Sequence, residues 1–251
     1  MKSGFAGMVT KVVGEGSCAI IGITAKQARL TALQRARADA IEKASGIKVA
    51  ANTIVTNGKL AVDLIKTFTS GYIVSEKKEW LPLGEYRSEE SAVPIPEYRV
   101  RIEAEVMVPE KLVDVGLEAK LNKITFIKGD KAFIKIKARK DAQFAIFNLM
   151  ANDKVVMLYP NTYHREKMLT KGEEFLFPEK GAIYDLEMST FDGHSQDSEA
   201  FLIAATDDKT VNFNLLYGYA EELTFTEFYN KYSKIADKVQ EVILPYQVFE
   251  K

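Results

Sequence analysis

The segment Ala25–Ala44 carries the most regular pattern of small apolar and polar residues in the chain. Its alanines recur every three or four positions, which places them on one face of a helix. Thr24 and Gln27 form a capping-box pattern at its start, and Gly46 suits the left-handed position after its last turn. We therefore predict a helix whose smooth face lies closely on a β-sheet. That face consists of Ala25, Ala28, Ala32, Ala36, Ala40 and Ala44.

The basic residues of the same segment fall mainly off the alanine face. Charged residues along the outer side of a helix usually form a solvated surface. We favour that interpretation over a binding patch. The residues concerned are Lys26, Arg29, Arg35, Arg37 and Lys43.

Extended segments lie on both sides of this helix. Tyr98–Val108 alternates apolar residues with Arg and Glu, so one face of the strand is core and the other faces water. Met8–Ile23 is also extended, with Gly14-Glu15-Gly16 expected as a break inside it. Half-buried strands of this kind favour an antiparallel sheet with a helical layer on one side. The other predictions in this half are strands at Ile47–Val55 and Tyr72–Leu81, a turn at Asn57-Gly58, a short helix at Leu60–Phe68 and a mobile connection at Pro82–Pro96.

Beyond Pro109 the pattern changes to short strands separated by turn residues, as in a β-sandwich or small barrel. An apolar stripe over Phe225–Ile243, opened by a capping-box pattern at Thr224 and Glu227, predicts a terminal helix. We therefore predict an α+β fold of two domains. Residues 1–113 form a helix on an antiparallel sheet, and residues 114–251 a β-sandwich-like domain with a terminal helix. The strands expected in the second domain are Phe133–Ala138, Gln143–Met150, Val155–Tyr159, Tyr184–Thr190 and Ala200–Thr206.

Composition changes this picture little. The chain has 251 residues, of which 47% are hydrophobic and 27% charged, enough for two cored domains. The net charge of −1 offers no general attraction to nucleic acid or anionic lipid, and we expect no nucleic acid as a partner. No apolar run approaches the roughly 18 residues of a membrane span. The start, MKSGFAG, has no hydrophobic region after its Lys, so it is not a signal peptide as it stands.

Residues able to carry out catalysis are scarce. Cys18 is the only cysteine, which excludes an internal disulfide and a Cys-rich metal site. Because it stands beside Ala19 and Ile20, we expect a buried small residue rather than a reactive thiolate. The sequence has no G-x-S-x-G motif and no phosphate-binding loop. We therefore predict no enzymatic activity and no cofactor.

The two histidines, His164 and His194, are the remaining candidates. His194 lies in the run DGHSQDSE, residues 192–199, which gathers carboxylates and one imidazole. These are metal-ligand types, but their spacing matches no defined calcium loop. A metal site stays open, and we favour a solvated turn. We assign no catalytic residues; the weak candidates for a metal are Asp192, His194, Asp197 and Glu199.

The first half resembles a known family. Residues from about Gly14 to Val108 are similar to the N-terminal domain of the flagellar assembly protein T type, also seen in small bacterial lipoproteins. The resemblance implies an α+β fold with a helix against a short antiparallel sheet. It rests on the alanine-striped helix and on Gly14-Glu15-Gly16, Ser45-Gly46-Ile47-Lys48-Val49, Gly71-Tyr72-Ile73, Tyr98-Arg99-Val100 and Val106-Met107-Val108.

Residues from about Ile127 to Val211 resemble the domain-of-unknown-function 4384 family. In that family a strand ends in a Pro-Asn turn, and a later Gly and Glu precede a strand that ends in Ala-Thr; Gly193 and Glu199 fill these places. The resemblance implies a β-rich accessory module and no catalytic residues, because the family is uncharacterised. The segments that carry it are Val155-Val156-Met157-Leu158-Tyr159-Pro160-Asn161, Leu176-Phe177-Pro178 and Glu199-Ala200-Phe201-Leu202-Ile203-Ala204-Ala205-Thr206.

Both families occur mainly in bacterial envelope and surface-associated proteins. The resemblance implies export to the periplasm or cell envelope, with a leader peptide missing from this chain; a cytoplasmic regulatory module is the alternative. The first hypothesis is a non-enzymatic scaffold or binding module with a protein partner, and it expects no buried cluster of titratable groups. The second is a cell-wall ligand-binding or hydrolytic protein, which expects Asp192, His194 and Asp197 to converge in a cleft. The oligomeric state stays open.

Overall fold

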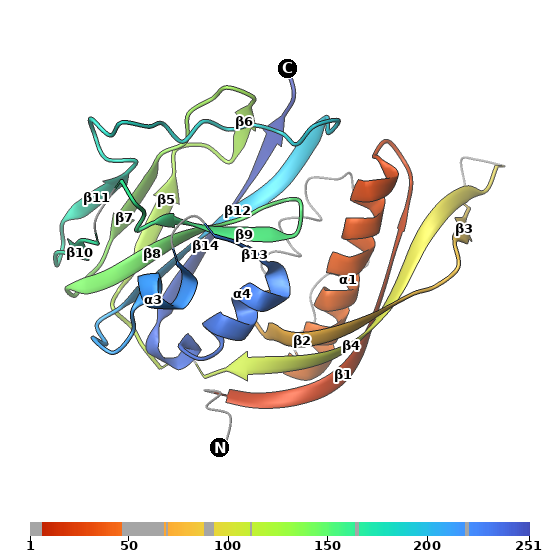
Figure 1. The fold of residues 1–251 in the computed structure, drawn as a ribbon, viewed down its shortest axis with the longest axis horizontal. Helices are drawn as coiled ribbons and strands as arrows, with labels where there is room; N and C mark the ends of the chain where they lie inside the picture. Colours follow the sequence, from red (N-terminus) through yellow and green to blue (C-terminus); the bar gives the residue numbers. More distant parts are fainter. Residues whose placement is uncertain are drawn as a thin grey trace. The chain divides into compact units, whose positions relative to one another are not determined.

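The computed structural model describes residues 7–46, 68, 70–87, 93–110, 112–163, 166–218 and 221–251. They fall into two compact units, Gly7–Pro109 and Glu110–Lys251, which are described separately (Figure 1). The described elements are mostly β-strands with three α-helices, in agreement with the α+β class. The strand expected at Ile47–Val55, the turn at Asn57-Gly58, almost all of the helix at Leu60–Phe68, and His164 lie outside the described residues.

The N-terminal unit contains an antiparallel sheet in the order β1-β4-β2. Its strands are β1 (Gly7–Ala19), β2 (Tyr72–Trp80) and β4 (Ile95–Pro109), and the short β3 (Gly84–Tyr86) also pairs with β4. The alternation predicted for β4 is confirmed in the middle of the strand: Val100, Ile102, Ala104 and Val106 are buried, whereas Arg99, Arg101 and Glu103 are exposed. The connection expected at Pro82–Pro96 contains β3 and the start of β4.

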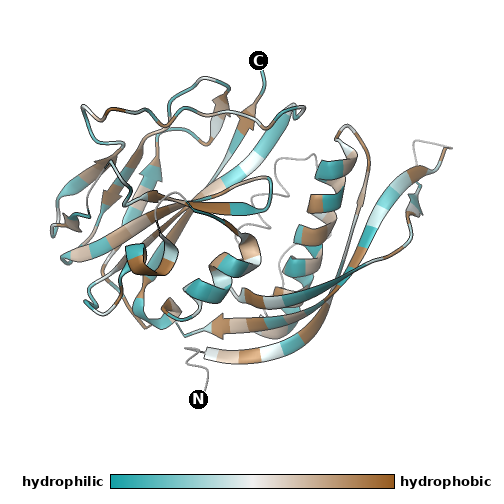
Figure 2. Ribbon diagram, viewed as in Figure 1, coloured by the Kyte–Doolittle hydropathy of each residue, from teal (hydrophilic) through white to brown (hydrophobic). Residues whose placement is uncertain are grey.

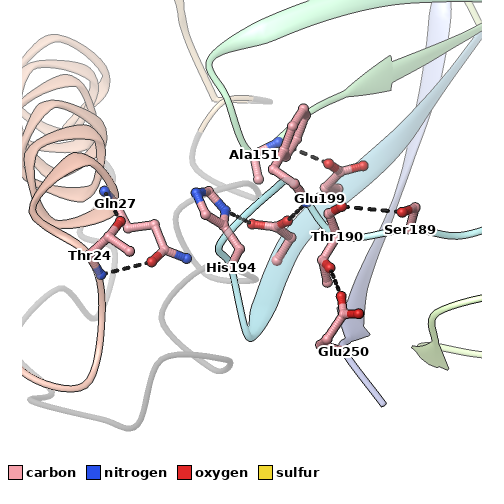
Figure 3. Close-up of polar contacts among 10 residues, drawn as sticks. Thr24, Gln27, Ala151, Ser189, Thr190, His194, Glu199 and Glu250 are labelled. Atoms are coloured by element: carbon pink, nitrogen blue, oxygen red, sulfur yellow. Dashed lines mark hydrogen bonds and ion pairs between the residues drawn. The ribbon is translucent and has the colours of Figure 1, made fainter.

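Helix α1 (Ala25–Ser45) confirms the strongest local prediction. The Thr24 hydroxyl accepts a hydrogen bond from the Gln27 amide, and the Gln27 side chain accepts one from the Thr24 amide (Figure 3). At the other end, Gly46 is left-handed with φ 71°, where a residue without a Cβ is unstrained. The buried alanines of the stripe are Ala28, Ala32, Ala36 and Ala40, each with no exposed surface.

The glycines of β1 correct the expectation of a break in this strand. Gly14 and Gly16 stay within the β1 ladder, opposite Ile102 and Val100 of β4. A Cβ added to Gly14 would lie 2.1 Å from the Ala36 carbonyl oxygen, and one added to Gly16 would lie 2.2 Å from that of Ala32. The strand therefore approaches the helix backbone so closely that only glycine fits.

The prediction that the basic residues of the helix are solvated is wrong for Arg37, whose side chain is only 1% exposed. Its guanidinium forms a two-point ion pair with Glu76 of β2, at 2.6 Å from Nη2 to Oε1 and 2.9 Å from Nε to Oε2. Three further basic residues of the helix contact the sheet: Arg29 stacks over the Trp80 ring at 4.3 Å, Arg35 donates to the Ser17 carbonyl, and Lys43 donates to the Val13 carbonyl. A buried charge is tolerated here because its partner is also buried and fully engaged.

The C-terminal unit contains two described sheets. The larger runs β13-β9-β8-β12-β14-β6, with β10 also paired to β8, and the smaller runs β11-β7-β5. All pairs are antiparallel except β14 with β6. The strands are β5 (Glu118–Leu121), β6 (Thr125–Ile127), β7 (Ile134–Lys137), β8 (Ala142–Leu149), β9 (Lys154–Tyr159), β10 (Met168–Leu169), β11 (Glu174–Phe177), β12 (Gln196–Thr206), β13 (Glu222–Thr224) and β14 (Gln240–Phe249).

Side chains from both sheets form one core, which includes Ile136 of β7, Phe144 of β8 and Ile203 of β12. The opposite face of β8 is covered by helices: Phe147 contacts aromatic rings of α3 (Phe213–Tyr217) and α4 (Phe225–Tyr232). Strands covered on both faces are apolar without alternation. This explains the unbroken apolar run in β12, and the apolar central strands are visible in Figure 2.

The predicted terminal helix is wrong beyond its first two turns. The capping box at Thr224 and Glu227 is present, but α4 ends at Tyr232. A short 3₁₀ turn at Ala236–Lys238 follows, and the chain then becomes β14, which pairs with β12. The residues of β14 are rich in β-branched side chains and include Pro245, which a helix interior would not accept.

Two further expectations change. Tyr184–Thr190 is not a strand, and a single bridge between Lys131 and Glu187 is its only described pairing of that kind. In contrast, the strand expected at Ala200–Thr206 begins at Gln196, which moves part of the acidic run from a turn onto β12. The units change at Pro109–Glu110, near the predicted boundary at 113; their status as separate domains stays a prediction.

Candidate functional site

A cavity of about 350 Å³ lies against the larger sheet of the C-terminal unit. Its sheet side is formed by Asn148 of β8, Glu199 and Phe201 of β12, and Tyr246 of β14. No Lys, Arg or His side chain belongs to the described lining, so the cavity offers an anion no countercharge. The remaining lining residues are Met150, Leu186, Glu187, Met188, Ser189, Thr190 and Phe191.

Strand register brings the polar lining groups together. Glu199 lies directly opposite Tyr246 in the β12–β14 pair, and Phe201 lies opposite Asn148 in the β12–β8 pair. Glu199 and Phe201 are two residues apart, so they share one face of β12. The Phe201 and Tyr246 rings stack with their centroids 4.6 Å apart, which fixes the direction of the tyrosine.

The three polar side chains are bonded to one another. Glu199 Oε2 is 2.6 Å from the Tyr246 hydroxyl and accepts from Asn148 Nδ2 at 3.0 Å. The Tyr246 hydroxyl is also 2.9 Å from Asn148 Oδ1. The other carboxyl oxygen, Oε1, accepts from the Ala151 amide at 3.1 Å (Figure 3). Both oxygens of Glu199 are therefore committed to contacts within the unit.

Burial dominates the electrostatics of this network. Glu199 is 6% exposed, and its desolvation raises the pKa of the carboxyl above the ordinary value. Hydrogen bonds from Tyr246, Ala151 and Asn148 oppose that shift without cancelling it. Burial, followed by the charge of Glu199, also raises the pKa of Tyr246 well above that of a free tyrosine. The site thus favours neutral forms of both groups.

His194 is not on a solvated turn. It is 7% exposed, and its Nδ1 lies 2.6 Å from Oδ1 of Asp197, which is 4% exposed. The second oxygen of Asp197 accepts from the Phe191 amide at 2.7 Å. Asp197 therefore fixes both the imidazole and the end of the segment that lines the cavity.

The four candidate metal ligands divide into separate arrangements. His194 and Asp197 form the pair just described, Glu199 belongs to the cavity network, and Asp192 is exposed. Among the residues that the structure describes, no three His, Cys, Asp or Glu side chains gather in a way that could hold a metal ion. The described geometry therefore gives the metal hypothesis no support.

The segment 186–191 is also held from the end of β14. The Thr190 hydroxyl donates to Glu250 (Figure 3), and the Glu250 backbone amide donates to the Ser195 carbonyl at 2.9 Å. Lys128 forms an ion pair with the same Glu250 at 2.8 Å. One wall of the cavity is thus fastened to the sheet at two places, by Asp197 and by Glu250.

Cys18 is 6% exposed, which confirms the predicted buried position. Burial raises the pKa of its thiol, with the nearby Arg35 acting in the opposite direction. The thiol form is therefore favoured over the thiolate, and the residue has the character of a small apolar side chain.

Sequence reasoning missed Asn148 and Tyr246. Asn148 is the polar residue that interrupts the apolar run Phe144–Leu149, and an interruption of this kind signals a polar contact beneath the sheet surface. Tyr246 could not be placed, because the predicted helix ended just before it. Only the β12–β14 register sets it opposite Glu199.

Comparison with known proteins agrees with the resemblance of the second half. Residues 125–207 match the family model described as Domain of unknown function (DUF4384). The match includes Asn148, the segment 186–191 and Glu199, and it ends before Tyr246. No curated protein matches the chain. None of the described helices is both long enough and apolar enough to cross a membrane.

Proposed function

We propose that this chain is a non-enzymatic protein of the bacterial cell envelope that acts as a scaffold or binding module in an envelope or surface assembly. Its binding site is the cavity of the C-terminal unit. A volume of about 350 Å³ suits a small ligand or an inserted side chain of a partner. The lining that the structure describes has no cationic side chain, which favours an uncharged or cationic occupant over an anion.

The observation that carries the proposal is that the carboxylates in and beside the cavity already form hydrogen bonds within the unit. A general acid, base or nucleophile must reach a substrate atom directly or through one water. Both oxygens of Glu199 are engaged inside the unit, and Asp197 is engaged by His194 and the Phe191 amide. Side chains held in this way support a binding surface and are poorly placed for proton transfer to a ligand.

The buried network also changes the scaffold hypothesis. That hypothesis expected no buried cluster of titratable groups, and the described residues contain one at the cavity. A purely surface-acting scaffold has no need of such a group, since burying polar atoms costs free energy unless each is satisfied. We therefore favour recognition at the cavity over recognition by the outer surface alone.

The envelope location is supported by the resemblances of both halves. The N-terminal likeness to the flagellar assembly protein T type stays an expectation. Fractionation of cells that express the native gene tests the location, with the protein expected in the periplasmic or envelope fraction. Recovery in the cytoplasm alone would contradict this part of the proposal.

Site-specific photocrosslinking tests the binding site. A photoreactive amino acid replaces Ser189, which is exposed and lines the cavity, or Leu215, which is 85% exposed and outside the lining. We expect the same defined adduct from envelope extract only with the probe at 189. Equal capture at the two positions, or none at 189, would show that the cavity is not the contact site.

A hydrolytic cell-wall protein is the second candidate, favoured by the buried His194–Asp197 pair. Purified protein is incubated with cell-wall glycan, beside His194→Ala and the surface variant Asp207→Ala, which changes an exposed residue that this hypothesis does not involve. The binding proposal expects no released fragments from any of the three. Turnover that is lost only in His194→Ala would replace the proposal with this second function.

A further inference from the structure

The hydrogen-bond ring at the cavity needs one hydrogen more than Tyr246 and Asn148 can supply if Glu199 is ionised. Three contacts close a ring: Tyr246 to Glu199, Tyr246 to Asn148, and Asn148 to Glu199, at 2.6, 2.9 and 3.0 Å. Each contact needs one hydrogen between its two heavy atoms. The tyrosine supplies one and the amide nitrogen supplies one. The third can come only from the carboxyl group.

The count does not depend on the orientation of the Asn148 amide, which is assigned from the network itself. With Nδ2 toward Glu199, the carboxyl donates to the Tyr246 hydroxyl, which donates to Oδ1. With the amide reversed, nitrogen donates to the tyrosine, the tyrosine donates to the carboxyl, and the carboxyl donates to the amide oxygen. In both arrangements, Glu199 carries a hydrogen.

We propose that Glu199 is protonated in the folded protein, and that its ring with Tyr246 and Asn148 is a pH-sensitive clasp that joins β8, β12 and β14 at the cavity. Protonation gives each of the three contacts one hydrogen. Loss of the proton leaves two oxygens facing each other without a hydrogen between them. The clasp does not depend on the proposed binding function, since it follows from the internal geometry of the unit.

The charged groups around Glu199 favour the neutral form. On its own strand, Asp197 raises the pKa of Glu199 after the larger effect of burial. On β14, the group that faces Glu199 is the phenol of Tyr246. On β8 and the turn after it, the facing groups are the neutral side-chain amide of Asn148 and the backbone amide of Ala151. The segment 186–191 adds Glu187, and the described lining adds no basic side chain.

Protonation of Glu199 predicts the direction in which the free energy of unfolding changes with pH. The unfolded carboxyl titrates near 4.5, and the folded one at higher pH. Between the two values the folded state holds more protons than the unfolded state, so stability falls as pH rises. The clasp contributes fully below the unfolded pKa and is lost as pH rises through the folded pKa.

Carbon-13 NMR of the glutamate carboxyl groups tests the proton directly in the full chain. Signals are assigned by through-bond experiments, so the wild-type spectrum decides the question without a variant. As pH rises, we expect Glu199 to keep the chemical shift of a protonated carboxyl after Glu174 has ionised, because Lys135 and Lys137 lower the pKa of Glu174. Titration of Glu199 at or below 4.5 would overturn the proposal.

The test substitution is Glu199→Gln, because the amide side chain is close in shape to the protonated carboxyl and carries no charge at any pH. We expect wild-type protein to become easier to unfold with urea as pH rises above 4.5, and the variant to lose most of that dependence. The surface variant Glu174→Gln is expected to keep the wild-type profile. If Glu199→Gln and wild type show parallel profiles, the clasp does not respond to pH.

Discussion

At the scale of single residues, the ion pair of Arg37 and Glu76 is the clearest case of charge held inside this protein. Burial by itself raises the pKa of Glu76, but the hydrogen bonds and charge of Arg37, with help from Lys78, lower it to about 2. The sequence showed Arg37 as one of several basic residues on a helix. Its partner lies on strand β2, 39 positions away, so no local pattern could reveal the pair.

The pair predicts a loss of stability in acid. Because the folded pKa of Glu76 is below the unfolded value of 4.5, its contribution is present above that value and is lost as pH falls toward about 2. A shift of this size corresponds to roughly 3 kcal/mol of unfolding free energy. Urea unfolding between pH 2 and 5 measures it, and Glu76→Gln is expected to remove the dependence.

The control for this prediction is the exposed pair of Lys11 and Glu105, whose side chains are 83% and 40% exposed. Surface pairs of this kind contribute less than about 1 kcal/mol, so Glu105→Gln is expected to follow wild type closely. An unchanged acid profile in Glu76→Gln would show that the buried pair does not couple to folding.

At the scale of elements, local signals were sufficient for α1 and β4 and insufficient for β14. The caps of α1 are contacts within a few residues, and the alternation of β4 records one buried face. In contrast, Phe225–Ile243 shows helical spacing that the tertiary structure overrides after Tyr232. Pairing with β12 satisfies the backbone of β14 and helps to bury Tyr246 and Val248, which outweighs helix propensity.

The contact between β1 and α1 gives a prediction at this scale. Gly16→Ala places a Cβ 2.2 Å from the Ala32 carbonyl oxygen, so the strand and helix must separate. Overpacking of this kind typically costs about 1–3 kcal/mol, and a backbone neighbour leaves little room to relax. Thermal or urea unfolding of the variant measures the loss.

Gly84→Ala in β3 is the matched control, because its nearest obstacle is the flexible Arg99 side chain at 2.8 Å. We expect a clearly smaller loss for this variant than for Gly16→Ala. Equal losses at the two positions would mean that general strand propensity, rather than the close approach to the helix, determines the effect.

At the scale of the whole molecule, each unit has its own buried core. The N-terminal unit buries the alanine face of α1 against its sheet, and the C-terminal unit buries residues between its sheets and beneath α3 and α4. A unit with a complete core of its own can fold alone. A separate core in each unit is what the two-domain prediction from the sequence requires.

We therefore predict that residues 110–251, expressed alone, fold into the same structure as in the full chain. The measurement is a two-dimensional amide NMR spectrum of the fragment, overlaid on that of the whole protein. Dispersed peaks that coincide for the core strands are expected, since β8, β12 and β14 form their described ladders within this range. Collapsed, poorly dispersed peaks would contradict the prediction.

The sequence by itself determined the features that short-range physics controls: the capped helix α1, the half-buried strand β4, the buried position of Cys18 and the β-rich second half. Only the tertiary structure decided that Arg37 is buried, that the glycines of β1 let helix α1 pack closely on the strand, and that Glu199 forms hydrogen bonds with Tyr246 and Asn148. Each of these depends on strand register or on a partner far along the chain. Such pairings depend on shape and hydrogen-bond satisfaction across the folded unit, and these leave no periodic signal in a single sequence.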